Sequence, residues 1–329
     1  MPPPPSPDEH AAPGALDATA TPGSPASQAS PAGGLAAGAA AYFLWGLLPI
    51  YIAALGAAGP VEIVAHRATW SLVLCLVVLA ATRSLHRFIA VWRDPRAVGL
   101  LALAALLVAA NWLVYVYAIA TERAVDGSLG YYLNPLVTVL LGVGLLGERL
   151  RPAQWAACGL GALAVAVLTV AGGSGGSSPW IAVTLALSFG LYGLTKKRVG
   201  ATVGPLPGMA VETSVLLVPA AGYLVWLAAA GRGVMGADDP VLDALLVGTG
   251  AITTVPLLLF AVAARRLPLS TVGLLQFLAP TLQFLVAVFV FHEPMPPMRW
   301  VGFGIVWLAV VVLSVDMVGA ARRLHRLRG

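Results

Sequence analysis

Charged side chains are scarce in this sequence. Asp, Glu, Lys and Arg make up 10% of its 329 residues, whereas hydrophobic residues make up 59%. A soluble domain carries roughly 25% charged residues, so this chain has too little polar surface for a soluble protein of its length. A lipid bilayer removes that need, because a helix bundle can expose an apolar face to lipid. The net charge of +5 does not indicate nucleic-acid binding, because the basic residues lie in short clusters between apolar runs.

Cysteines and metal-ligand patterns are also sparse. The two cysteines, Cys75 and Cys158, lie inside apolar segments without metal-ligand spacing, so we interpret them as small core residues. The sequence has no HExxH pair, and its five histidines are scattered. We therefore expect no enzyme, no metal and no cofactor. A membrane-embedded enzyme and a membrane protein without transport activity are the alternatives from other classes.

The first 33 residues differ from the rest of the chain. They begin with four consecutive prolines after Met1 and contain no Lys or Arg. No apolar run here is long enough to bury, so residues 1–33 are expected to form a disordered tail. They also lack the basic start of a secretory signal peptide.

Apolar runs of membrane-spanning length follow this tail. A spanning helix needs about 20 mainly apolar residues, and such runs are too long for barrel strands. The sequence predicts an all-α integral membrane protein with ten spans, near 34–57, 61–82, 97–119, 127–147, 153–171, 179–195, 208–229, 241–264, 269–291 and 298–317.

Basic residues in the connections predict the orientation. If the N-terminus is cytoplasmic, 15 of the 19 Lys and Arg fall on the cytoplasmic side. The four others are Arg67, Arg123, Arg232 and Arg299. The excess of basic residues on one side predicts a multi-pass protein of the cell membrane with both termini in the cytoplasm. Residues 322–329 would form a basic cytoplasmic tail.

The chain also repeats a pattern. Pro, Glu, Trp and Gly recur with spacings of 13, 7 and 4, at Pro135, Glu148, Trp155 and Gly159 and again at Pro280, Glu293, Trp300 and Gly304. The sequence therefore predicts two five-helix repeats, 34–178 and 179–321. Because five is odd, the second copy must enter the membrane from the opposite side. Such inverted repeats are typical of alternating-access transporters.

Several longer motifs carry a family resemblance. They are YFLWGLLP at 42–49, EIVAHR at 62–67, NWL at 111–113, SLGYYLNPL at 128–136, LGER at 146–149, FGLYGL at 189–194, TTVPL at 253–257 and QFLAP at 276–280. Together they resemble the RarD family, in the EamA branch of the drug/metabolite transporter superfamily. This resemblance covers about 35–320 and implies ten helices, a prokaryotic cytoplasmic membrane and transport of small organic molecules. The family carries a chloramphenicol-sensitivity label.

Charged residues near the start of the second span are candidates for substrate contact. A charge at membrane depth usually faces the bundle interior, so His66 and Arg67 could bind an anion or zwitterion. Glu62, one turn away, is a candidate partner or coupling group. The alternative is an arginine that reaches the outer surface and is held there by Glu62.

Polar and aromatic residues in the third and fourth spans form a second group. Asn111 and Tyr115 share one helix face, and so do Tyr131 and Asn134. With Trp112 they could line a substrate cavity, because polar groups in lipid need partners or water. Interhelical hydrogen bonding that fixes the bundle is the alternative. Gln276, in the QFLAP motif, joins the candidate cavity residues.

Prolines within spans could act as hinges or static kinks. Pro135 and Pro280 occupy matching positions in the two repeats, and Pro256 lies in the eighth span. A proline inside a helix removes a backbone hydrogen bond and clashes with the preceding turn.

Three further glutamates are candidate ion-pair or coupling groups. Glu148 and Glu293 end the fourth and ninth spans, where a carboxylate needs a cation such as Arg151 or Arg299. Glu212 matches Glu62 in the repeat and is the best candidate for a protonatable coupling site. Its alternative is a pairing with Lys196 or Lys197 at the cytoplasmic edge.

These features predict a permease or exporter that moves a small molecule by alternating access within the lipid bilayer. Proton coupling and uncoupled facilitation both stay open, and so does a homodimer.

Overall fold

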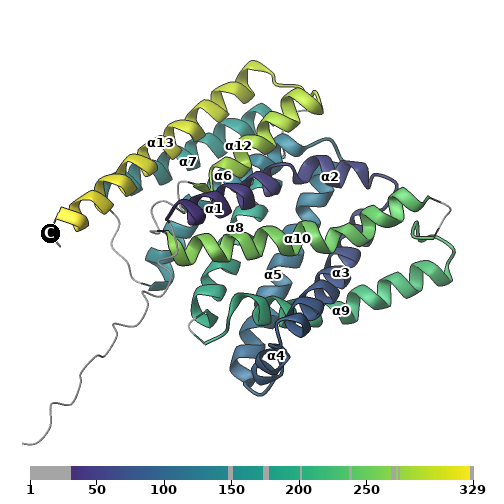
Figure 1. Ribbon diagram of the computed structural model, residues 1–329. Coiled ribbons are helices and arrows are strands. Elements are labelled where there is room, and N and C mark those ends of the chain that lie inside the picture. Colours follow the sequence, from purple (N-terminus) through teal and green to yellow (C-terminus); the bar gives the residue numbers. More distant parts are fainter. Residues whose placement is uncertain are drawn as a thin grey trace, which may run out of the picture.

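Helices form all the regular structure in the described part of the chain. The computed structural model describes residues 31–146, 151–172, 178–200, 202–236, 239–267, 272 and 275–326. The elements are α1 (Pro31–Gly46), α2 (Leu48–Ala54), α3 (Pro60–Ala81), α4 (Leu85–Trp92), α5 (Pro95–Ala120), α6 (Ala124–Leu146), α7 (Pro152–Gly172), α8 (Pro179–Val199), α9 (Pro205–Ala229), α10 (Pro240–Arg266), α12 (Leu278–Leu285), the π-helical turn η1 (Val286–Val290) and α13 (Pro297–Arg326). Figure 1 shows them as one bundle.

Proline sets the start of most long helices. It occupies the first position of eight of them, at Pro31, Pro60, Pro95, Pro152, Pro179, Pro205, Pro240 and Pro297. Its fixed φ suits this position, where the missing N–H has no helical partner to lose. Before two of these prolines, Asp94 and Asp239 cap the helix by accepting hydrogen bonds from backbone N–H groups of the first turn.

Seven of the described helical segments are long and apolar enough to cross a membrane. They are Ala32–Ala54, Pro60–Ala81, Pro95–Ala120, Pro152–Val170, Pro205–Ala229, Pro240–Ala263 and Pro297–Asp316. Their outer faces are apolar, as at Val170, Val218 and Val225, which are 75%, 78% and 68% exposed. Such a surface suits lipid rather than water.

The expectation of ten spans goes beyond these seven. The apolar segment Leu278–Val290, in the ninth expected span, is shorter. Two further expected spans coincide with α6 and α8, which are 23 and 21 residues long. Asp126 and Asn134 lie in α6, and α8 ends in basic residues. At the C-terminus, α13 continues to Arg326, into the expected basic tail.

Helices from distant parts of the chain pack side by side. Along one edge of the bundle α13 packs on α7, and in another part of the bundle α3 packs on α9 (Figure 1). Between them, α10 contacts α1 and α3, while α8 contacts α5 and α6. Glycine permits the closest approaches: a side chain at Gly250 would overlap the Trp70 backbone, and one at Gly130 would lie 2.9 Å from the Ala182 carbonyl oxygen.

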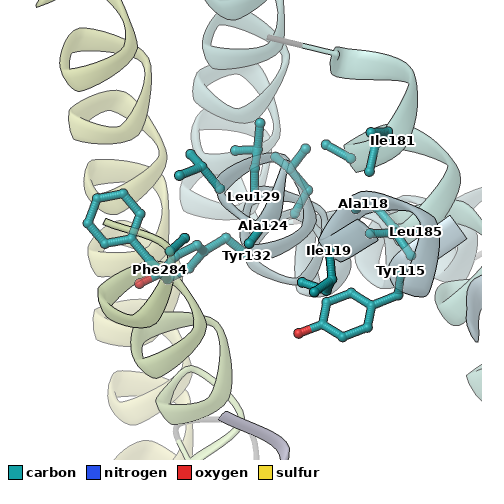
Figure 2. Close-up of a cluster of buried hydrophobic side chains, with 14 of the residues drawn as sticks. Tyr115, Ala118, Ile119, Ala124, Leu129, Tyr132, Ile181, Leu185 and Phe284 are labelled. Carbon is teal, nitrogen blue, oxygen red and sulfur yellow. The ribbon is translucent and has the colours of Figure 1, made fainter. Parts of the chain in front are cut away.

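The largest apolar cluster lies around α6. Leu129 and Tyr132 from this helix meet Ile181 and Leu185 from α8, and Phe284 from α12. Figure 2 shows these side chains converging on the α6 ribbon from both sides. This packing fixes α6 between α8 and α12.

Candidate substrate-binding site

Arg67 is buried where α3 meets α5 and α10. It lies about two turns into α3, and 3% of the residue is exposed. Its Nε donates a hydrogen bond to Thr253 Oγ1 in α10 at 3.2 Å, and its guanidinium carbon lies 4.4 Å from the centre of the Trp112 ring in α5. The side chain therefore points inward, and its partners are Thr253 and Trp112 rather than the expected Glu62.

Small residues on α3 permit this inward orientation. Ala65 and Ala68 flank Arg67 and pack against Ala105 of α5 and Leu216 of α9. Because these side chains are short, α5 and α9 come close to α3 and leave the arginine between α5 and α10. The local sequence thus places a guanidinium where a large apolar side chain would otherwise fill the core.

The Arg67 charge has no carboxylate partner among the described residues. Their ion pairs are Arg151–Asp316, Lys196–Glu212 and Arg299–Asp126. In the same part of the chain, Arg67 Nη1 has no hydrogen-bond partner at all. A buried cation is costly unless it is paired, and Trp112 and Thr253 compensate it only in part.

Asn111 is a hydrogen-bonding hub one turn from Tyr115 on α5. Its Nδ2 donates to the Leu185 carbonyl at 3.1 Å and to Ser188 Oγ at 3.0 Å, both in α8. Its Oδ1 accepts a hydrogen bond from the Tyr131 hydroxyl of α6 at 3.0 Å. This buried amide therefore ties α5, α6 and α8 together, as the bundle-fixing alternative expects.

Four aromatic rings form a continuous row beside Asn111. The ring centres of Tyr115 and Tyr131 are 5.4 Å apart, those of Tyr131 and Phe189 are 6.0 Å apart, and those of Phe189 and Tyr192 are 5.7 Å apart. We call these four residues the aromatic row. Tyr115 lies one helical turn from Trp112 on α5, and Trp112 stacks on Arg67. The Arg67 site comprises Arg67, Trp112, Thr253 and the first two rings of this row.

Tyr115 presents an unused hydroxyl to this site. The residue is 1% exposed, and its hydroxyl has no hydrogen-bond partner among the described residues. In Figure 2 its ring extends away from Leu185 and Ile181 of the apolar cluster. A buried hydroxyl without a partner is unfavourable, so it is available to a polar ligand.

His66 and Glu62 lie toward the start of α3. Glu62 Oε1 accepts a hydrogen bond from the Val234 N–H, in the connection after α9, at 2.9 Å. His66 is 4% exposed, and neither ring nitrogen has a hydrogen-bond partner within the described ranges. Glu62 thus holds a connecting segment, and no contact joins it to Arg67.

Glu212 forms a separate polar cluster with α8. The residue is 3% exposed, its Oε1 lies 2.5 Å from Lys196 Nζ, and its Oε2 accepts a hydrogen bond from the Tyr192 hydroxyl at 3.3 Å. Lys196 is the partner named in the alternative for this glutamate. Tyr192 also ends the aromatic row, so the row connects the Arg67 site with the Glu212 cluster.

The remaining candidates lie apart from Arg67. Asn134 is half-buried in α6, and its Oδ1 has no partner among the described residues. Gln276 is half-buried in the turn before α12. Pro135 and Pro256 lie inside α6 and α10, whereas Pro280 is the third residue of α12. A proline in a first turn breaks no helical hydrogen bond, so the two matched prolines differ in their local effect.

One buried charge cluster contains Glu293 and Arg299, which the sequence singled out, and Asp126, which it did not. Asp126 of α6 accepts hydrogen bonds from Arg299 Nη2 of α13 at 3.0 Å and from the Ser178 N–H at 2.8 Å. Glu293 accepts hydrogen bonds from the Ala124 and Val125 N–H groups at the start of α6. Burial raises the pKa of Glu293, while the two N–H donors and the Arg299 charge oppose that rise. For Asp126, the only signal in the sequence was an acidic residue at a helix start.

Some expectations concern other residues. Glu148 lies outside the described residues, while Arg151, its expected partner, pairs with Asp316 at 2.6 Å. Cys75 and Cys158 are free and buried. Within the described ranges, no group of three or more His, Cys, Asp or Glu side chains is arranged to hold a metal ion.

Several apolar helices with polar groups buried between them define a multi-pass membrane protein. The EamA-like transporter family matches residues 32–170 and again residues 177–315, and the chain belongs to this family. It is 47% identical over 290 residues to the RarD protein of Streptomyces exfoliatus, covering 88% of this chain and 90% of that one. The resemblance to RarD proteins is thereby confirmed.

Other relatives agree with this assignment. The RarD protein of Escherichia coli (strain K12) is 38% identical over 287 residues, covering 87% of this chain and 95% of that one. An uncharacterized transporter of Vibrio cholerae is 43% identical over 288 residues, covering 88% and 94%. A solved crystal structure with 20% identity and a TM-score of 0.58 covers 86% of this chain and 98% of its own, which shows a shared fold.

Proposed function

We propose that this membrane transporter moves small organic molecules by alternating access between two inverted five-helix halves. The observation that carries the proposal is the Arg67 site. Its partners come from both halves, because Trp112 lies in α5 and Thr253 in α10. Transporters with inverted repeats bind substrate at the interface of the repeats, near the middle of the membrane.

The order of the helices supports two equivalent halves. The family match occurs twice, and each match covers one half. If α1, α3, α5, α6 and α7 correspond to α8, α9, α10, α12 and α13, the contact of α1 with α10 has its counterpart in that of α8 with α5. The contacts of α3 with α9 and of α7 with α13 are their own counterparts. These pairings favour ten spans, with residues 34–178 and 179–321 as the halves. The basic residues in the connections favour both termini in the cytoplasm.

Glu212 is the proposed coupling group. A buried carboxylate next to Lys196 and Tyr192 could change its protonation when the bundle opens and exposes it to water. Its position at the end of the aromatic row offers a physical link to the substrate site. An uncoupled facilitator is the alternative, and it would use the same Arg67 site without this titration.

A transport screen tests the proposal. Purified protein in liposomes would be offered labelled amino acids, organic acids and chloramphenicol, with and without an inward-acid pH gradient. Chloramphenicol belongs in the panel because a relative in Pseudomonas aeruginosa, 31% identical, is named chloramphenicol-sensitive protein RarD. We expect saturable uptake that Arg67→Ala and Asn111→Ala abolish. Folded protein that moves no compound in either direction would contradict the proposal.

The matched control is Arg232→Gln. Arg232 also stacks on a tryptophan, with its guanidinium carbon 5.6 Å from the Trp226 ring centre, but it is exposed in a connection. Its loss should leave uptake unchanged. Equal losses in the Arg67 and Arg232 variants would indicate a general effect of removing arginine rather than a binding site.

A further inference from the structure

We infer that the Arg67 site binds a small organic monoanion, with a carboxylate on an aromatic or apolar body. This inference rests on the proposed transport function and adds the class of substrate. It depends on three properties of the site: an uncompensated positive charge, an unused hydroxyl, and an aromatic surface with no available negative charge nearby.

The positive charge defines the end of the ligand that reaches Arg67. Arg67 is 3% exposed, lacks a carboxylate partner in the described part of the chain and leaves Nη1 without a hydrogen-bond partner there. A carboxylate can accept two parallel hydrogen bonds from a guanidinium, a geometry that a neutral oxygen reproduces poorly. Binding an anion would therefore compensate a charge that the protein leaves unpaired.

The Tyr115 hydroxyl adds a second donor. It is buried, lies one helical turn from Trp112, which stacks on Arg67, and has no hydrogen-bond partner among the described residues. The Tyr131 hydroxyl differs, because it already donates to Asn111 at 3.0 Å. Tyr115 can thus donate to a carboxylate oxygen without giving up a bond that holds the bundle together.

The aromatic row defines the rest of the ligand. From Tyr115 it continues through Tyr131 and Phe189 to Tyr192, with neighbouring ring centres no more than 6.0 Å apart. Trp112 covers the guanidinium on its α5 side. Aromatic faces and edges favour an aromatic or apolar body over a strongly hydrated one.

The acidic groups around the site argue against a zwitterion or a cation. Glu62 is engaged by the Val234 N–H at 2.9 Å, and Glu212 by Lys196 at 2.5 Å. Neither contacts Arg67, so an ammonium group there would meet a like charge with no carboxylate to offset it.

A matched set of four compounds tests the assignment. 3-Phenylpropanoate, 3-phenylpropanamide, phenylalanine and 2-phenylethylamine share a phenyl group on a two-carbon chain and differ in charge. Binding to the purified full-length protein in detergent would be followed by tryptophan fluorescence and by the shift in unfolding temperature. We expect 3-phenylpropanoate to bind at least about tenfold more tightly than the other three. Equal or tighter binding of phenylalanine, the amide or the amine would overturn the inference, and so would no binding by any of the four.

Variants locate the response. Arg67→Gln should weaken 3-phenylpropanoate binding at least about tenfold, Arg67→Lys should retain part of it, and Arg232→Gln should leave it unchanged. Tyr115→Phe removes only the unpartnered hydroxyl, so it should fold normally and bind the anion several-fold more weakly. Anion binding that persists at full strength in both Arg67→Gln and Tyr115→Phe would place the anion elsewhere and refute the inference.

Binding and transport separate the two proposals. Carboxylate-selective binding without uptake in liposomes would support the monoanion site and count against the transport function. Uptake of neutral or cationic compounds, with no response to 3-phenylpropanoate, would support transport and refute the monoanion site.

Discussion

Arg67 and Arg299 are buried to the same extent, since each is 3% exposed, but their surroundings differ. Arg299 forms an ion pair with Asp126 at 3.0 Å and donates a second hydrogen bond to the Pro294 carbonyl at 3.0 Å. Arg67 has one hydroxyl and one tryptophan face. Within the described residues, one buried guanidinium is therefore compensated by a carboxylate and the other is not.

The difference separates a structural arginine from a binding arginine. Removing a residue whose charge is satisfied leaves its partner buried and unpaired, which is strongly destabilising. Removing a charge that has no counter-ion relieves a cost instead. The two arginines should therefore respond in opposite ways, and the variants below test this contrast in order of the expected loss of stability.

Arg299→Gln should have the largest effect. It leaves Asp126 buried, with the Ser178 N–H as its remaining hydrogen-bond donor in the described structure. We expect a loss of about 3–5 kcal/mol in the free energy of unfolding, as for other broken buried ion pairs. Chemical unfolding in detergent measures it, with Arg232→Gln as the exposed control. If Arg299→Gln loses no more free energy of unfolding than Arg232→Gln, Arg299 does not stabilise the fold.

Asn111→Ala should come next. It breaks two hydrogen bonds to α8 and leaves the Tyr131 hydroxyl without its acceptor. The expected loss is about 1–3 kcal/mol, measured in the same way. Asn134→Ala is the matched comparison, because the Asn134 Oδ1 has no partner in the described structure and its loss should cost less. A larger loss of stability in Asn134→Ala than in Asn111→Ala would indicate that Asn134, and not Asn111, holds the helices together.

Glu212→Gln should destabilise less than Arg299→Gln. The Lys196 side chain is 26% exposed and can turn toward water, so we expect a loss of about 1 kcal/mol. The informative measurement is the accumulation of substrate driven by a pH gradient. In Glu212→Gln this accumulation should disappear, while exchange of substrate at equal pH on both sides continues. Asp316→Asn, which breaks the more exposed pair with Arg151, is the control. Accumulation that survives in Glu212→Gln would favour the uncoupled facilitator.

The sequence alone predicted the features of this fold that depend on short segments of the chain. Long apolar runs predicted most of the described helices, because this signal is contained within each segment of about 20 residues. The motif at 62–67 also identified Arg67 as a candidate. The expected pairing of Arg67 with Glu62 followed from helical spacing alone. In the structure Arg67 instead contacts Trp112 and Thr253, which lie on two other helices.

Long-range pairings were beyond that reasoning. Arg299 meets Asp126 across 173 residues of chain, and nothing in the local sequence around either residue specifies the other. The satisfied Asn111 amide is a similar case, since its partners Leu185 and Ser188 lie 74 and 77 residues away. Only the packing of α5, α6 and α8 reveals which buried polar groups are paired and which are free to bind a ligand.

The most direct test of this account is the stability of Arg67→Gln without ligand, measured beside Arg299→Gln. An uncompensated charge contributes little to the fold, so we predict a free energy of unfolding within about 1 kcal/mol of the original protein, or higher. Such a result, together with the large loss in Arg299→Gln, would establish that Arg67 is kept for binding. A loss in Arg67→Gln as large as that in Arg299→Gln would contradict the account and make Arg67 a structural residue.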